Sequence, residues 1–262
     1  LDALVLEFGI TTAVAIVHLT YWTPLALALR SSRGFRIVYD CMDEWTDFPN
    51  IGAPLLLAEQ RLVDEADLVT VTAALLEDKF RGRAARCLLV RNGVDFEYFS
   101  RNCVPNGVVG QLQRPIVGYY GALAEWVDFK LIAGIARARP DWTILLVGDV
   151  FVDDLAGLAD LPNVHMTGRR PYAEMPKFLY HFDVCLVPFK VNEMTQAVDP
   201  VKFYEYVSGG KPVVSVPLYE MRIYGDYAYF AEGVKSFISC IDAALQESDP
   251  GMWQARIALA KD

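Results

Sequence analysis

The sequence predicts an α/β protein with two domains, each built on a parallel β-sheet. Short apolar runs alternate with helical segments along the chain, a pattern typical of parallel strands joined by right-handed crossovers. The alternation breaks at 101–114, where Asn, Pro and Gly recur, so this stretch is the expected linker. A length of 262 residues is comfortable for two hydrophobic cores.

The first series of elements, residues 1–100, predicts a partial first domain. Strands are expected from short β-branched runs, and helices from apolar residues at helical spacing. The chain begins with Leu1 and enters an apolar run almost at once, so we expect an N-terminal portion of this domain to be missing. The expected strands are 14–20, 36–41, 68–71 and 87–90, and the expected helices are 24–30, 54–66 and 73–80.

The second series, residues 115–250, predicts a complete second domain. Its helix at 171–181 is expected to be interrupted at Pro176, because proline lacks an amide N–H. A last helix at 251–262 is expected to return to the first domain. The other helices are expected at 127–139, around 202–205 and at 233–246, and the strands at 116–120, 142–147, 164–166, 184–187 and 213–216.

Composition and charge exclude several classes of function. The chain is 53% hydrophobic and 22% charged, as in well-buried globular proteins. A net charge of -9, without a basic stripe, disfavours nucleic acid as a partner. No segment has the length and apolarity of a membrane span. Five scattered cysteines without a Cys-x-x-Cys pair indicate reduced thiols in the cytoplasm, and the dispersed histidines give no metal-ligand spacing.

The segment 199–214 carries the clearest functional signal. It predicts a loop, a short helix with Lys202 and Glu205 on one face, a double-glycine stop and a buried strand. The first turn of a helix offers N–H groups that favour an anion such as phosphate. A cation and a carboxylate beside such a turn are suited to the phosphate and the ribose of a nucleotide.

Four motifs in this order resemble those of GT-B glycosyltransferases of the GT4 (group 1) type. Residues 91–95 with Phe99 resemble the "NGVD…F" signature that ends their first domain. Residues 118–123 resemble the first strand and glycine loop of their donor domain, and 161–168 their "NVxxxG" strand. The segment 199–214 resembles their donor-sugar segment. The resemblance implies a GT-B fold, with two Rossmann-like domains facing a cleft and the first domain incomplete.

The resemblance gives roles to the residues of the donor domain. Glu205 matches the second Glu of the family's Glu-x7-Glu pattern, which accepts hydrogen bonds from ribose hydroxyls. The first Glu is replaced by Ala197, so the stereochemistry of transfer stays open. Lys202 is expected to contact the diphosphate, although a surface pair with Glu205 is the alternative. The remaining donor-site candidates are Gly121, Ala122, Arg169 and Phe203, with Asn192, Thr195 and Asp199 in the donor-sugar loop and Glu193 as an alternative there.

The acceptor side is expected where a strand of the first domain ends. Asp43, after the strand at 36–41, is the candidate base that removes a proton from the acceptor hydroxyl. A capping or solvent-exposed carboxylate is the competing interpretation. His18, also at a strand end, is a second candidate for the acceptor site.

We therefore expect a glycosyltransferase that moves a sugar from a nucleotide-diphosphate sugar to an acceptor hydroxyl. The family's usual chemistry implies no cofactor and no metal, with a glycan or lipid-linked acceptor in bacterial cell-surface polysaccharide or glycolipid synthesis. The expected location is the cytoplasm, with peripheral association at the inner face of the membrane. A non-catalytic nucleotide-sugar-binding scaffold is the alternative, favoured by Ala197, and a sugar-nucleotide epimerase is a third hypothesis.

Overall fold

A computed structural model describes residues 2–48, 51–101, 107 and 109–262. The chain divides into two compact units, 1–92 with 196–199, and 93–195 with 200–262. Each unit is built on a parallel sheet, so the predicted α/β class is confirmed. Residues 102–106 and 108 of the expected linker lie outside the described residues.

The N-terminal unit has a four-stranded parallel sheet in the order β1-β2-β3-β4. Its core lies on one face, where the strand residues Ile37, Tyr39 and Val69 pack against Leu62 of α3. The strands are β1 (Val14–Val17), β2 (Arg36–Cys41), β3 (Leu68–Val71) and β4 (Cys87–Leu89), and the helices are α1 (Asp2–Glu7), α2 (Thr23–Arg33), α3 (Ala53–Glu65) and α4 (Ala74–Phe80).

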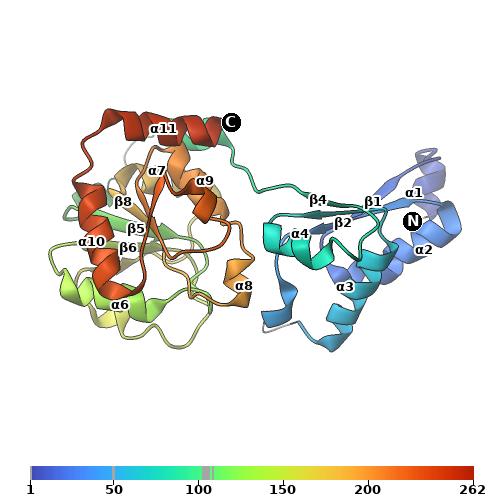
Figure 1. Ribbon diagram of the computed structural model, residues 1–262, viewed down its shortest axis with the longest axis horizontal. Coiled ribbons are helices and arrows are strands. Elements are labelled where there is room, and N and C mark those ends of the chain that lie inside the picture. Colours follow the sequence, from blue (N-terminus) through green and yellow to red (C-terminus); the bar gives the residue numbers. More distant parts are fainter. Residues whose placement is uncertain (1, 49–50, 102–106, 108) are drawn as a thin grey trace. The chain divides into compact units, whose positions relative to one another are not determined.

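The C-terminal unit has a six-stranded parallel sheet in the order β10-β9-β8-β5-β6-β7. The helices α6 and α10 contact each other on one side of it, and α9 contacts α11 on the other (Figure 1). The strands are β5 (Ile116–Tyr120), β6 (Thr143–Val147), β7 (Val164–Met166), β8 (Val184–Val187), β9 (Val213–Ser215) and β10 (Ala228–Phe230). The helices are α5 (Phe96–Phe99), α6 (Phe129–Ala138), α7 (Met175–His181), α8 (Glu193–Gln196), α9 (Val201–Ser208), α10 (Gly233–Leu245) and α11 (Pro250–Lys261).

The central strands of this sheet are buried on both faces, which explains why they appear as unbroken apolar runs. Every residue of β5, β6, β8 and β9 is buried. Close packing also uses glycines. A side chain at Gly134 of α6 would meet Val234 of α10 at 2.5 Å, so the glycine lets these two helices approach.

Some element predictions were wrong in detail. The expected interruption at Pro176 does not occur: Pro176 lies in the first turn of α7, where its missing N–H breaks no helical hydrogen bond. A short 3-10 turn, η5 (Tyr172–Glu174), precedes it. The apolar run at the start, which was expected to be strand-like, is the helix α1, and the short elements β10 and α8 were not predicted.

Candidate functional site

Glycines mark the carboxyl edge of the C-terminal sheet. Gly121 follows β5 and Gly148 follows β6, both with positive φ, at 135° and 153°. A Cβ on Gly148 would lie 1.9 Å from the carbonyl oxygen of Gly121, so the two backbones touch. Gly121 N–H donates to Val147, and Gly148 N–H donates to Gly168 after β7. We call this meeting of Gly121, Gly148 and Gly168, at the ends of β5, β6 and β7, the glycine joint. At Gly121 and Gly148 only glycine fits.

The side chain of Lys202 crosses this glycine joint. A Cβ on Gly121 would lie 2.2 Å from Lys202 Cε and 2.9 Å from Nζ. The ammonium lies 5.6 Å from the centre of the Tyr119 ring and 5.8 Å from that of Phe189. The aromatic faces attract the cation and hold it at the strand ends. Gly121 and Lys202, which are far apart in sequence, therefore lie together at this edge of the sheet.

Glu205 lies one helical turn further along α9 and is 5% exposed. Its Oε1 accepts a hydrogen bond of 3.1 Å from the hydroxyl of Tyr172. Burial raises the pKa of Glu205, while the Tyr120 and Tyr172 hydroxyls and Lys202 oppose that rise. The Tyr120 hydroxyl is buried and has no hydrogen bond of standard geometry within the described part of the chain. The carboxylate thus faces two phenols and a nearby cation.

Three other donor-site candidates differ in how accessible they are. Ala122 follows Gly121 at the joint, and its carbonyl accepts a hydrogen bond of 3.1 Å from the Tyr119 hydroxyl. The Arg169 side chain is 84% exposed, 3.9 Å from Asp149 after β6. Phe203 is fully buried, with its ring 4.7 Å from that of Tyr224. A direct contact between the Phe203 ring and a ligand is therefore not available in this structure.

The residues of the expected donor-sugar loop do not form one group. Asn192 and Thr195 bond each other reciprocally, with Asn192 N–H donating to Thr195 Oγ1 and Thr195 N–H to Asn192 Oδ1, which caps α8. Asp199 belongs to the N-terminal unit, where its carboxylate and carbonyl accept hydrogen bonds from Asn92. Ala197 is buried in the core of the same unit.

The carboxyl edge of the N-terminal sheet carries a row of polar side chains across three strands. His18 Nδ1 lies 3.0 Å from Asp40 Oδ2, and the Thr70 hydroxyl donates to Asp40 Oδ1 at 2.7 Å. Asp43 lies beyond this row, after β2, with its carbonyl accepting from the thiol of Cys41. Its neighbour Glu44 is paired with Lys79. The structure therefore places Asp43 and His18 at the same edge.

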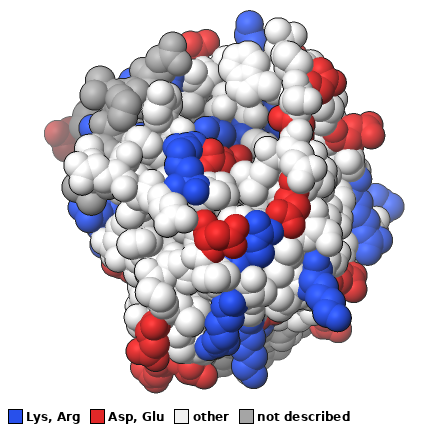
Figure 2. Space-filling view, turned by 90° about the vertical axis from the view of Figure 1, so that its left-hand side faces the viewer, with Lys and Arg blue, Asp and Glu red and all other residues white. Residues whose placement is uncertain are grey.

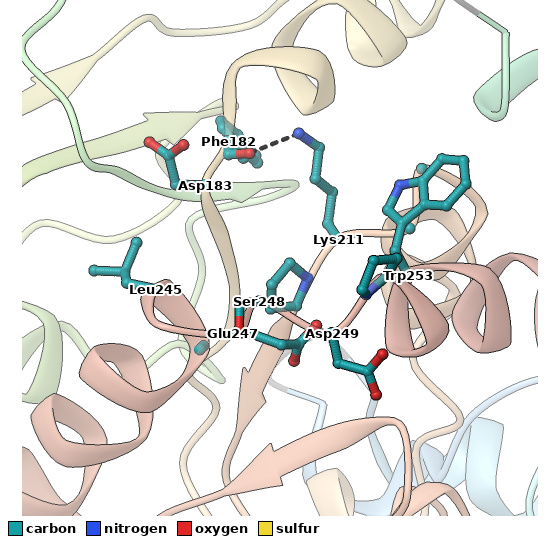
Figure 3. Close-up of a pocket in the computed structure, with 13 residues that line it drawn as sticks. Phe182, Asp183, Lys211, Leu245, Glu247, Ser248, Asp249 and Trp253 are labelled. Atoms are coloured by element: carbon teal, nitrogen blue, oxygen red, sulfur yellow. Dashed lines mark hydrogen bonds between the residues drawn. The ribbon is translucent and has the colours of Figure 1, made fainter.

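The opposite, amino edge of the C-terminal sheet carries a hollow of about 390 Å³ between the sheet and the α10–α11 connection. Figure 2 shows this side of the unit, with acidic and basic side chains around a depression. Lys211 donates to the carbonyl oxygen of Phe182 at 2.8 Å, as Figure 3 shows. It also donates to the carbonyl oxygen of Tyr180 at 2.9 Å.

The acidic side chains of the hollow are also paired. Asp183 accepts from the Ile116 amide and from Arg114. Glu247 accepts from Arg256. The fold at this edge is therefore stabilised by hydrogen bonds of Lys211, Asp183 and Glu247.

Tyr172, Tyr120 and Gly148 were missed as site residues. Tyr172 follows the donor-site candidate Arg169 after β7, so its position near that residue was the available signal. Tyr120 is the last residue of an apolar strand, and nothing in its local sequence marks its hydroxyl as facing Glu205.

Among the described residues, no group of three or more His, Cys, Asp and Glu side chains is arranged to hold a metal ion. None of the described helices has both the length and the apolarity needed to cross a membrane.

Comparison with known proteins supports the family resemblance. TuaH of Bacillus subtilis (strain 168), named as a teichuronic acid biosynthesis glycosyltransferase, is 34% identical over 202 residues, which cover 70% of this chain and 51% of TuaH. The chain thus spans about half the length of this curated relative.

Solved structures share the fold. HepE of Anabaena, in complex with UDP and glucose, has a TM-score of 0.75 at 16% identity, covering 95% of this chain and 73% of HepE. Sucrose-phosphate synthase of Thermosynechococcus elongatus has a TM-score of 0.74 at 16% identity, covering 99% and 71%. The fold is GT-B, with two parallel-sheet units, the first one smaller. Residues 114–247, about half of the chain, match the family model for glycosyl transferases group 1. This chain belongs to the glycosyl transferases group 1 family.

Proposed function

We propose that this protein is a glycosyltransferase that transfers a sugar from a nucleotide-diphosphate sugar to an acceptor hydroxyl. The observation that carries the proposal is the convergence of Gly121, Lys202 and Glu205 at the carboxyl edge of the C-terminal sheet. Open α/β sheets bind ligands at this edge, and the three residue types match the parts of a nucleotide diphosphate.

Lys202 holds the diphosphate in this proposal. Its side chain packs on Gly121 at the carboxyl edge of the sheet, which places the ammonium to offset the charge of a diphosphate bound there. Glu205 accepts the ribose hydroxyls, because an ionised carboxylate offers only acceptors to the two O–H groups. Arg169, exposed at the next strand end, attracts the ligand from solvent.

In the proposed transfer, one bond forms and one bond breaks at the anomeric carbon of the sugar. The acceptor oxygen forms a bond to the anomeric carbon, and the bond between that carbon and the diphosphate oxygen breaks. The electron pair leaves with the diphosphate, whose charge Lys202 offsets without a metal or another cofactor. In an inverting reaction Asp43 takes the proton of the acceptor hydroxyl. The pair His18–Asp40, held by Thr70, is the alternative proton acceptor.

The partners are proposed from the family and its curated relative. TuaH is named for teichuronic acid biosynthesis, and the family resemblance implies bacterial cell-surface polysaccharide or glycolipid synthesis, so we propose a glycan or lipid-linked acceptor for this chain. The proposed location is the cytoplasm, with peripheral association at the inner membrane face.

Release of nucleoside diphosphate from a panel of nucleotide sugars, with and without glycan acceptors, tests the proposal. The wild-type chain is expected to release the diphosphate from at least one donor, and Lys202→Ala and Glu205→Ala to lose that activity. Binding of a nucleotide sugar with neither transfer nor hydrolysis would instead support the non-catalytic scaffold, which the replacement of the first family Glu by Ala197 favours.

A further inference from the structure

The Glu205 carboxylate is already engaged in the ligand-free structure. Its Oε1 accepts the Tyr172 hydroxyl at 3.1 Å. If the ribose hydroxyls bind this carboxylate, as the proposed function requires, then Tyr172 and the ribose compete for the same group. Glu205 is only 5% exposed, so little of it is open to a further donor. A buried acceptor exchanges one donor for another rather than standing empty.

The two phenols that face Glu205 differ in how easily they can move. Tyr120 ends β5 and is 3% exposed, so its hydroxyl is fixed by the sheet. Tyr172 lies on the surface turn η5 and is 59% exposed. A side chain on a surface turn, in a residue that is more than half exposed, leaves its place without opening a cavity in the core. Tyr172 is therefore the displaceable partner.

The Tyr172 ring rests on α5 of the same unit. It stacks on Tyr98 with ring centres 5.9 Å apart and planes 8° apart, and meets the edge of Phe99 at 5.6 Å. The Arg101 guanidinium covers the Tyr98 ring at 4.0 Å. These contacts hold the ring in the position from which its hydroxyl reaches Glu205.

Tyr172 remains a hydrogen-bond donor over the working pH range. Burial and the neighbouring Glu205 carboxylate raise the pKa of Tyr172 to about 12. The phenol is therefore protonated at neutral pH, and the contact is a hydrogen bond from a neutral donor to a carboxylate.

We propose that Tyr172 occupies the ribose acceptor Glu205 in the empty site and is displaced by the ribose hydroxyls, so that it sets the affinity for ribonucleotides. This inference rests on the proposed nucleotide site. It assigns Tyr172 as a positioning residue, which acts through Glu205 and not on the reacting atoms.

Calorimetric titration with the four common ribonucleoside diphosphates tests the proposal. The diphosphate that binds the wild-type chain best is then compared with its 2′,3′-dideoxy form. Tyr172→Phe keeps the ring and removes the hydroxyl. We expect it to bind the ribonucleotide about three- to tenfold more tightly, since one competing hydrogen bond is lost. The dideoxy ligand is expected to change less than about twofold, because it does not compete for the carboxylate.

Two further variants separate the mechanism from a general effect. Tyr180→Phe removes the hydroxyl of an exposed tyrosine on α7, outside the site, and is expected to leave both affinities unchanged. In a Glu205→Gln background, Tyr172→Phe is expected to give no gain, because the charged acceptor is gone. Unchanged or weaker ribonucleotide binding by Tyr172→Phe overturns the inference, as does equal tightening for both ligands. If the wild-type chain binds none of the four diphosphates, the proposed function itself fails.

Discussion

The two edges of the C-terminal sheet use lysine in opposite ways. At the amino edge, Lys211 donates to two backbone carbonyls, and burial lowers the pKa of its ammonium. At the carboxyl edge, Lys202 lies across Gly121 and between aromatic faces. One cation stabilises the chain's own backbone. The other packs against a strand-end glycine and two aromatic rings, at the edge where open α/β sheets bind ligands.

The difference shows that a charged hollow is not by itself a binding site. The amino-edge hollow has a volume of about 390 Å³, yet its Lys211, Asp183 and Glu247 are engaged by groups of the fold. At the carboxyl edge, the decisive features are two glycines with positive φ and a buried carboxylate. Substitutions at each edge test this difference.

Gly148→Ala has the largest expected effect. The new Cβ would lie 1.9 Å from the Gly121 carbonyl oxygen, and the neighbour is backbone that cannot rotate away. We expect the free energy of unfolding to fall by about 3 kcal/mol or more, measured by urea denaturation. Gly168→Ala is the matched control: its φ is also positive, at 66°, but nothing lies within 4 Å of the added Cβ. Equal losses for the two variants would contradict the glycine joint.

Lys211→Met is expected to affect stability and not ligand binding. It removes two donors from the carbonyls of Tyr180 and Phe182, so the free energy of unfolding should fall by about 1–3 kcal/mol. Lys177→Met, on the exposed face of α7, should change it by less than about 0.5 kcal/mol. A loss of nucleotide affinity in Lys211→Met would remove the distinction between the two edges.

The pH dependence of nucleotide binding probes Glu205. Its pKa is raised by burial, and the groups facing it are Tyr120 of β5, Tyr172 of η5 and Lys202 of α9. Above the raised pKa the carboxylate is ionised and accepts both ribose hydroxyls; below it the group is protonated. Affinity should therefore rise with pH through a window above the usual Glu pKa of 4.5.

Glu205→Gln supplies the control for this titration, because it keeps the shape of the side chain without its ionisation. Calorimetry between about pH 5 and pH 8 should show a flatter profile in Glu205→Gln, with only the ligand's own phosphate titration remaining. Identical profiles in both proteins would show that Glu205 does not contact the ligand.

Arg169→Ala is expected to give the smallest effect. Its side chain is 84% exposed and 3.9 Å from Asp149, so solvent screens the pair. We expect unchanged stability and a loss of nucleotide affinity below about threefold, decreasing further in high salt. A salt-independent loss of tenfold or more would place Arg169 in direct contact with the ligand.

The sequence predicted the architecture better than the details of the site. Alternating apolar runs predicted every strand of the two sheets except β10, because buried parallel strands are apolar throughout. Lys202 and Glu205 were predicted from helical spacing and Gly121 from the family resemblance, and the structure brings Gly121 and Lys202 together. Local sequence patterns did not predict the contacts between side chains that are distant in sequence. Phe203 turned out to be buried against Tyr224, and Tyr172 reaches Glu205 only because a turn folds back over α9.

Calorimetric titration of Lys202→Met and Lys211→Met with nucleoside diphosphate tests the central contrast most directly. The two variants remove one ammonium each from opposite edges of the same sheet. We expect Lys202→Met to lose affinity by about thirtyfold or more, roughly 2 kcal/mol, with little change in stability. Lys211→Met should bind as the wild-type chain does and lose stability instead. Wild-type affinity in Lys202→Met, or an equal loss in both variants, would contradict the assignment of the carboxyl edge as the nucleotide site.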